Sequence, residues 1–156
     1  MERKAIVIYT DGSCLNNGAP NAAGGWAAIL TCGKHRKEIY GGELGTKNNR
    51  MELKAAIEAT KQLKVPCDVT IVTDSQYVCR CFSSIREWYN NGWRNKSGGK
   101  PANLDLLKEL MDIGVKGHHK FRFQYVEGHS GHPENERCDQ LARAEAHAVL
   151  KFQAAE

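Results

Sequence analysis

Two aspartates, Asp11 and Asp74, each close a run of apolar residues that is typical of a buried strand. In open α/β sheets, ligands gather beyond the carboxyl ends of strands. We therefore expect the two carboxylates to face one crevice, where they can bind a cation or move protons. Taken alone, each aspartate is also suited to a helix cap or a salt bridge, and Asp74 precedes Ser75 and Gln76 as a capping residue would.

Two further acids, Glu52 and Asp139, fall on the apolar sides of predicted helices. A buried carboxylate is costly unless it is paired with a cation or bound to a metal. The sequence offers few internal partners, so the four acids together favour a metal site over four separate salt bridges. The apolar residues on these helix sides are Leu53, Ala56, Ala59 and Leu63 around Glu52, and Ala142, Ala146 and Leu150 around Asp139.

The donor types indicate which metal such a site would hold. Carboxylate oxygens without an accompanying set of histidines and cysteines favour magnesium or manganese over zinc, and magnesium suggests phosphate chemistry. A zinc site is the alternative, because histidines and cysteines also lie close together in the sequence, although their spacing fits no common zinc motif. The residues concerned are His129, His132 and Cys138, with Cys79 and Cys81.

The composition is that of a folded chain. Its 156 residues are 41% hydrophobic and 26% charged, close to globular averages, which argues against a disordered, collagen-like or low-complexity chain. No linker, repeat or change of composition divides the sequence, and we expect one domain over residues 1–156. The 22 basic and 18 acidic residues give a net charge of +4, which permits a polyanionic partner without requiring one.

The first residues and the cysteines bear on location. The apolar run after Lys4 is too short for a signal peptide or a membrane span and ends at a carboxylate, so we predict a cytoplasmic protein that does not enter a membrane. Six cysteines are too scattered for a disulfide framework, and we expect reduced, mostly buried thiols. Nothing in the sequence indicates a dimer interface, and a monomer is expected.

The order of predicted elements indicates an α/β fold. Three strands separated only by turns are typical of an antiparallel meander, and the helix and strand that follow are typical of a βαβ crossover between parallel strands. A Gly- and Lys-rich stretch over residues 90–101 is expected to form an exposed loop. The predicted strands cover residues 4–11, 25–32, 37–40, 69–74 and 121–126, and the predicted helices cover residues 48–64, 75–83, 85–90, 103–113 and a last segment from Pro133.

Four ordered segments carry a resemblance to a known family. They read TDGSC at residues 10–14, NNRMEL at 48–53, TDSQYV at 73–78 and GHSGHPENERCDQLA at 128–142. These segments resemble the signature blocks of bacterial type 1 ribonuclease H, and the resemblance spans nearly the whole chain. It implies a ribonuclease H-like fold, in which a five-stranded mixed sheet, an antiparallel meander plus parallel strands, is flanked by helices.

The resemblance also implies an activity. The expected reaction is endonucleolytic hydrolysis of the RNA strand of an RNA/DNA hybrid, which leaves 5′-phosphate and 3′-hydroxyl ends. It implies two Mg²⁺ ions in the active site, replaceable by Mn²⁺, with His129 as a nearby catalytic histidine. The flexible Gly-Ser context of His129 suits a proton carrier. The metal-binding carboxylates implied by the family are Asp11, Glu52, Asp74 and Asp139.

Two other activities are compatible with such a sequence. One is a nucleic-acid-binding module that has kept its groove and lost catalysis, but all four acids are present here. The other is a different nuclease or transferase on the same fold, against which the segments at residues 10–14 and 128–132 argue. Cleavage tests on hybrid, RNA duplex and DNA duplex would separate the three.

The resemblance also implies contacts to the hybrid. One set of residues would lie along the minor groove of the hybrid and contact the 2′-hydroxyls that distinguish RNA from DNA, and Glu52 would contact one of these hydroxyls. A second set, on the loop that resembles the family's basic protrusion, would grip the DNA strand. The loop is less basic than in close relatives, because residues 89–91 replace a denser basic run. Lys47 stands where the family has a small hydroxyl residue in its pocket for a DNA phosphate. Trp88 is expected to pack against a neighbouring helix. The expected contacts are Gly12, Ser13, Cys14, Asn17, Asn48, Asn49 and Gln76, then Trp93, Arg94 and Lys96 on the loop.

Overall fold

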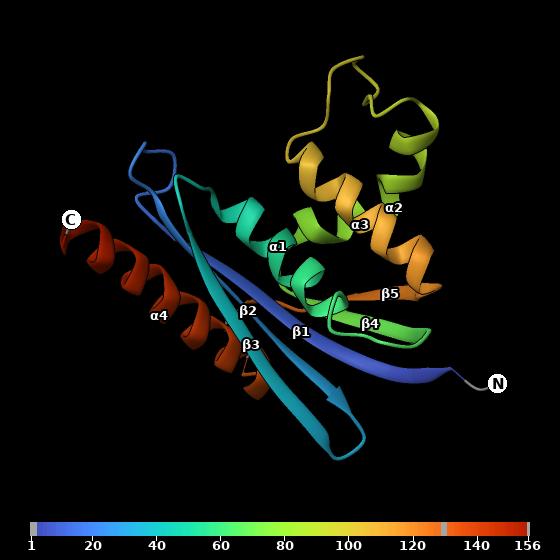
Figure 1. The fold of residues 1–156 in the computed structure, drawn as a ribbon, viewed down its shortest axis with the longest axis horizontal. Coiled ribbons are helices and arrows are strands. Elements are labelled where there is room, and N and C mark those ends of the chain that lie inside the picture. The colour runs from blue at the N-terminus through green and yellow to red at the C-terminus, as the bar shows by residue number, and fades with distance from the viewer. Residues whose placement is uncertain (1–2, 129–130, 156) are drawn as a thin grey trace.

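The chain folds into one sheet covered by helices on both faces (Figure 1). The structure is a computed structural model that describes residues 3–128 and 131–155. The predicted α/β class is confirmed. The strands are β1 (Lys4–Leu15), β2 (Ala23–Cys32), β3 (His35–Leu44), β4 (Cys67–Thr73) and β5 (Lys120–Tyr125), and the helices are α1 (Asn48–Thr60), α2 (Gln76–Asn90), α3 (Leu104–Gly117) and α4 (Pro133–Ala155).

The sheet is mixed and has the strand order β3-β2-β1-β4-β5. β1, β2 and β3 form the antiparallel meander predicted from the sequence, while β4 and β5 run parallel to β1. The pairing of β1 with β4 ends at Tyr9 and Val72, whereas its pairing with β2 continues to Leu15 and Ala23. β1 is therefore longer than the predicted strand 4–11, because β2 continues to supply hydrogen-bond partners where β4 has ended.

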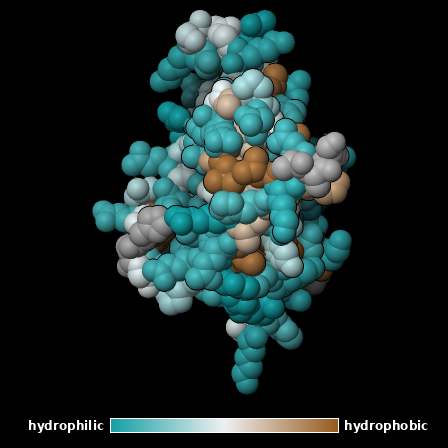
Figure 2. All heavy atoms as spheres, turned by 90° about the vertical axis from the view of Figure 1, so that its left-hand side faces the viewer, coloured by the Kyte–Doolittle hydropathy of each residue, from teal (hydrophilic) through white to brown (hydrophobic). Residues whose placement is uncertain are grey.

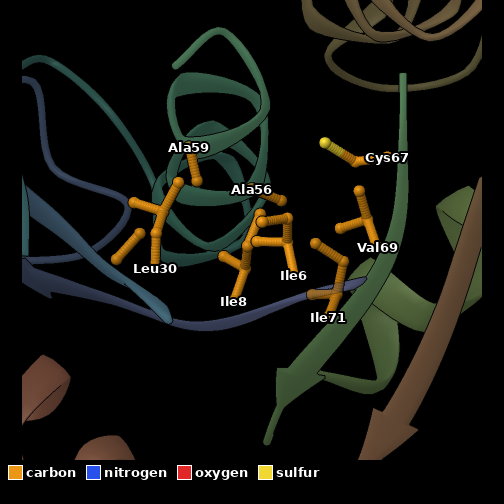
Figure 3. Packing of buried hydrophobic residues seen from close by; sticks show 9 residues of the cluster. Ile6, Ile8, Leu30, Ala56, Ala59, Cys67, Val69 and Ile71 are labelled. Carbon is orange, nitrogen blue, oxygen red and sulfur yellow. The ribbon is translucent and has the colours of Figure 1, made fainter. Parts of the chain in front are cut away.

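Each face of the sheet has its own core. α4 covers the face of β1, β2 and β3, and α1 packs on the opposite face, where α2 and α3 complete the helical layer (Figure 1). Beneath α1, the β-branched residues of β1 and β4 meet the alanines of the helix, as Figure 3 shows. Beneath α4, Gly25 allows close contact, because a β-carbon there would collide with the carbonyl oxygen of Ala142. The residues labelled under α1 are Ile6, Ile8, Leu30, Ala56, Ala59, Cys67, Val69 and Ile71.

Two helix predictions need correction. The segments predicted as separate helices over residues 75–83 and 85–90 form the single helix α2. The polar Ser83 does not interrupt the helix, because its hydroxyl donates to the carbonyl oxygens of Cys79 and Arg80 one turn earlier. α1 ends at Thr60 rather than at residue 64, and the chain continues through a turn toward Pro66.

Hydrophilic residues dominate one face of the molecule (Figure 2), and the thiols are free. None of the helices in the described ranges is long and apolar enough to cross a membrane. Figure 2 shows the side of the molecule that carries the C-terminus, and it is mostly hydrophilic with small, separate apolar patches. The cysteines are free, as predicted, but only Cys67, Cys81 and Cys138 are buried.

Candidate active site

Asp11 lies on β1, just beyond the last residue that pairs with β4. Its neighbours on the β2 side remain hydrogen-bonded, so the carboxylate is held on a regular strand while one flank of that strand is open. The side chain is almost fully buried, with the residue only 7% exposed, and the Gly12 N–H donates to Asp11 Oδ1 at 2.9 Å. A rigid strand thus presents a buried carboxylate at the edge of the parallel ladder.

Glu52 reaches Asp11 from the second turn of α1, as predicted from its place on the inward side of the helix. The close approach depends on Gly12, since a β-carbon there would lie 2.5 Å from the backbone nitrogen of Glu52. Within the described residues, Glu52 Oε2 is buried and has no hydrogen-bond partner. A buried carboxylate oxygen in this state is costly unless a cation satisfies it.

Asp74 directly follows β4 and completes the group. It is not the cap of α2, because the N-cap is Ser75, whose hydroxyl accepts from the Val78 N–H at 3.1 Å. The alternative interpretation of Asp74 as a capping residue is therefore wrong. The segment after β5 also approaches it, since a β-carbon on Gly128 would lie 2.9 Å from Asp74 Oδ2.

The three acids form a compact oxygen cluster. One carboxylate oxygen each from Asp11, Glu52 and Asp74 lies within 4.8 Å of the others. Burial first, and then the charge of Asp74, raises the pKa of Asp11 to about 7. Burial and the charge of Asp11 also raise the pKa of Glu52 well above its usual value. A divalent cation would supply the counter-charge that these buried, mutually repelling carboxylates need.

Asp139, on α4, lines a small cavity together with Asp11 and Asp74. It is half-buried, its charge adds to the rise in the pKa of Asp11, and Arg143 Nε donates to its Oδ1 at 3.1 Å from one turn later. It lies outside the three-carboxylate group and is positioned by α4. The residues that line the cavity are Asp11, Asp74, Glu127, Gly128, His132, Asn135, Glu136 and Asp139.

Comparison with known proteins identifies the family. The family model of RNase H matches residues 3–147. The chain belongs to the ribonuclease H family. A curated ribonuclease H of Thermus thermophilus is 46% identical over 151 residues, which cover 96% of this chain and 88% of the relative. The chain is thus a nuclease of this family, which uses divalent metal ions, and its acidic cluster fits a two-metal active site.

Solved ribonuclease H structures are similar in fold. LC9-RNase H1, a type 1 RNase H with the type 2 active-site motif, is 28% identical and superposes with a TM-score of 0.83, covering 96% of this chain and 75% of that one. LC11-RNase H1 in complex with RNA/DNA hybrid is 20% identical with a TM-score of 0.70, covering 93% and 99%. The predicted ribonuclease H-like fold is confirmed.

Some predicted residues of this ribonuclease H lie outside the acidic cluster. His129 is outside the described residues. Cys138 is a buried residue of α4 that packs against β2, and its thiol donates to the Tyr9 carbonyl oxygen at 3.4 Å. In the part of the chain that the structure describes, the group able to hold a metal consists of carboxylates and contains no histidine or cysteine. The zinc alternative therefore has no support there.

Sequence reasoning did not single out every residue of the cavity. Asn135 lines it, and so do Glu127 and Glu136. Asn135 was available from the sequence, because it precedes Asp139 by four residues and so lies on the same side of α4. Glu127 follows β5 in irregular backbone, where no periodicity reveals the direction of a side chain.

The expected minor-groove residues of this ribonuclease H lie on elements around the acids. Residues 12–14 form the end of β1, and Gln76 is the exposed first residue of α2. Asn48 and Asn49, both exposed, begin α1. Asn17 Oδ1 accepts from the Asn48 N–H at 3.0 Å, which ties the turn after β1 to the start of this helix.

The basic loop between α2 and α3 is anchored by its aromatic residues. Both Trp88 and Trp93 are partly buried against the apolar cluster of α1, α2 and α3, and Trp93 also contacts the ring of Tyr89 edge-on. Trp88 therefore packs as expected, but Trp93 does so as well. Arg94 Nη1 donates to the Gly98 carbonyl oxygen at 3.0 Å, whereas Lys96 is exposed.

Proposed function

We propose that this chain hydrolyses the RNA strand of RNA/DNA hybrids at a site that holds two divalent cations. The observation that carries the proposal is the gathering of three carboxylate oxygens within 4.8 Å in a member of the ribonuclease H family. The hybrid bound to LC11-RNase H1, a structure of the same fold, supports the choice of substrate. The proposed ligands are Asp11, Glu52, Asp74 and Asp139.

The residues present suit hard divalent cations. Carboxylate oxygens are the preferred ligands of Mg²⁺, with Mn²⁺ as a close substitute. The buried, unpartnered Glu52 Oε2 and the raised pKa of Asp11 both indicate a site whose charge is uncompensated by protein groups. We assign Asp11 to both ions, as the resemblance to the family implies, and in support Asp11 both belongs to the carboxylate cluster and lines the cavity with Asp139.

The division of labour among the four acids is the one that the resemblance to the family implies. When bound, the cations lower the pKa of the attacking water and stabilise the negative charge of the leaving oxygen. Glu52 and Asp74 are assigned to the side of the attacking water, and Asp139 to the second position. The water oxygen bonds to phosphorus and the P–O3′ bond breaks, which leaves a 5′-phosphate and, after the 3′-oxygen takes a proton, a 3′-hydroxyl.

Proton transfer is assigned to His129. A neutral imidazole can accept a proton near pH 7 and release it again, which few other side chains can do. In the sequence, His129 stands between Gly128 and Ser130, a context of small residues that suits a proton carrier.

Substrate choice is assigned to the residues around the acids. Asn48 and Gln76 begin two helices, and the amides of their side chains suit hydrogen bonds to base edges and sugar oxygens in a minor groove. With them we place residues 12–14, Asn17 and Asn49. Arg94 and Lys96 would contact phosphates of the DNA strand, and Trp93 would add stacking or support the loop.

The assay that tests the function compares three labelled duplexes, namely hybrid, RNA and DNA, with Mg²⁺, with Mn²⁺ and with a chelator. We expect cleavage of the RNA strand of the hybrid alone, and none with chelator. Asp11→Asn is the matched control, because it removes one ligand charge with little change in volume. Cleavage of the DNA duplex, or hybrid binding without cleavage by the parent protein, would contradict the proposal.

The proposal also covers the number of cations, the oligomeric state and the location of the protein. We expect two cations per site, which isothermal titration with Mg²⁺ and with Mn²⁺ tests by comparing the parent protein with Asp139→Asn, a variant that should lose one binding event. A monomer is expected in light scattering at micromolar concentration. A cytoplasmic location is expected from fractionation of the cells that make the protein.

A further inference from the structure

Asn135 is a polar, uncharged residue that lines the acidic cavity. It lies in the first turn of α4, four residues before Asp139, and both residues line the cavity together with Asp11 and Asp74. Its Oδ1 is shielded from solvent and accepts no hydrogen bond from the described residues. A carbonyl oxygen in this position is costly to bury, so a donor or a cation is expected to meet it in the working enzyme.

The cavity wall itself offers little to such an oxygen. Its charged members are mainly carboxylates, which when ionised accept hydrogen bonds and do not donate them. The amide oxygen of Asn135 finds no hydrogen-bond donor in ionised carboxylates, so it is suited to accept a hydrogen bond from water on a cation that these carboxylates bind. Mg²⁺ keeps several water molecules when it binds to proteins, and those waters are strong donors.

We propose that the amide oxygen of Asn135 is a further positioning group of the cation site, on the side of Asp139, where it accepts a hydrogen bond from the hydration shell of the bound ion. This inference rests on the proposed two-cation function. Asn135 adds an oxygen without adding charge, which favours a hydrated cation while limiting the repulsion that already raises the pKa of Asp11. Outer oxygens of this kind orient a metal and tune its affinity.

The test measures metal binding in the absence of substrate. Isothermal titration with Mn²⁺ is run on the parent protein and on Asn135→Leu, Asn135→Asp and Asn135→Ala, with Gln140→Leu, an exposed change on the same helix, as matched control. We expect Asn135→Leu and Asn135→Ala to weaken Mn²⁺ binding about 10-fold or more. Asn135→Asp should bind at least as tightly as the parent, and Gln140→Leu should match the parent.

The competing outcomes are distinguishable. If Asn135 served only the packing of α4, the Leu and Ala variants would lose thermal stability while a folded fraction bound Mn²⁺ with parental affinity, and that result would overturn the inference. Asn135→Ala keeps the test valid where the larger leucine prevents folding. A parent protein that binds Mn²⁺ and cleaves hybrid, with unchanged affinity in the variants, contradicts this inference alone; a parent that fails to cleave contradicts the proposed function instead.

Discussion

Gly12 and Glu52 are in backbone contact: a β-carbon on Gly12 would lie 2.5 Å from the Glu52 nitrogen and 2.7 Å from the Met51 carbonyl carbon. These atoms belong to the backbone of α1 and cannot move aside as a flexible side chain would. The missing side chain of Gly12 therefore sets how near α1 lies to β1. It thereby sets how near the Glu52 carboxylate lies to that of Asp11.

Gly12→Ala is expected to damage both stability and the acidic cluster. The added methyl group must push α1 from β1, at a cost of about 1–3 kcal/mol in the free energy of unfolding. Because Glu52 moves with the helix, we expect hybrid cleavage to fall more than 10-fold in protein that remains folded. Urea unfolding and steady-state cleavage measure the two effects.

The control for this change is Gly114→Ala in the interior of α3. There a β-carbon meets only a ring atom of Phe121 at 3.4 Å, an ordinary contact, and alanine favours a helix over glycine. Stability should stay equal or rise slightly, with unchanged cleavage. Equal behaviour of the two variants would show that the contact at Gly12 has no special role.

The metal-free protein should lose stability as the pH rises through the carboxyl range. The pKa of Asp11 is raised from 3.8 to about 7, so the folded protein holds a proton that the unfolded chain releases. The free energy of unfolding therefore falls between about pH 4 and pH 7. Thermal unfolding with a chelator, scanned over this range, should show the fall, and Mg²⁺ should reverse it at pH 7.

Asp11→Asn is the matched comparison for the pH scan. It cannot ionise and it lowers the repulsion on Glu52, so its metal-free melting temperature at pH 7 should exceed that of the parent, and its dependence on pH should be shallower. Parallel profiles for parent and variant would mean that the cluster does not control the pH dependence of stability.

The acids were accessible to sequence reasoning because each sits in a regular element or directly follows one. Glu52 could be placed from helical periodicity, and Asp74 from the strand that precedes it. The contact between Gly12 and Glu52 could not be predicted in this way, because it joins two segments that are distant in the sequence and depends on how β1 and α1 pack. The same holds for the length of β1, which is set by its partner β2 rather than by its own composition.

The loop between α2 and α3 shows a second limit of sequence reasoning. Trp93 stays a predicted substrate contact, and what the sequence did not indicate is that its ring is also partly buried against the helices. Its backbone has a φ of 63°, in the left-handed region, and its N–H donates to the Trp88 carbonyl oxygen at 2.7 Å. Such a helix ending depends on tertiary support, which a composition rich in aromatic and basic residues does not reveal.

His129→Ala should slow turnover by about 10²-fold or more without weakening the binding of the hybrid, which is the range for a lost proton transfer. The measurement is a separation of kcat from KM on the labelled hybrid, together with a pH profile of kcat. The acidic limb of that profile should disappear in the variant. A raised KM with an intact kcat would instead assign His129 to substrate binding.

Arg36→Gln should loosen the start of α4. Arg36 on β3 donates to Glu134 at 2.8 Å and to Glu38 at 2.9 Å, and Glu38 in turn accepts from Arg137 at 2.9 Å. This surface network joins β3 to the turns of α4 that precede Asp139. We expect a melting temperature that is lower by a few degrees at low salt, with a smaller difference at 1 M salt, since salt screens the pairs.

Lys116→Gln provides the comparison for Arg36. Lys116 forms a single exposed pair with Asp112 on α3, and such isolated pairs contribute little to stability. Its melting temperature should match that of the parent protein at every salt concentration. An equally small effect in Arg36→Gln would show that packing alone holds α4 in place.

Lys96→Gln should weaken hybrid binding and make the binding constant less dependent on salt concentration. A lysine that neutralises one phosphate releases about one counterion, so its loss should lower the slope of log K against log[salt] by about 1. Lys96 is exposed and suited to this role, whereas Arg94 also holds the loop through the Gly98 carbonyl oxygen, so Arg94→Gln should affect loop stability as well.

Binding is measured by fluorescence anisotropy with the Asp11→Asn protein, which should bind without cleaving, and Lys116→Gln in that background should leave the slope unchanged. If Lys96→Gln also left the slope unchanged, phosphate contact by Lys96 would be refuted, because a removed cation–phosphate contact must change the number of ions released.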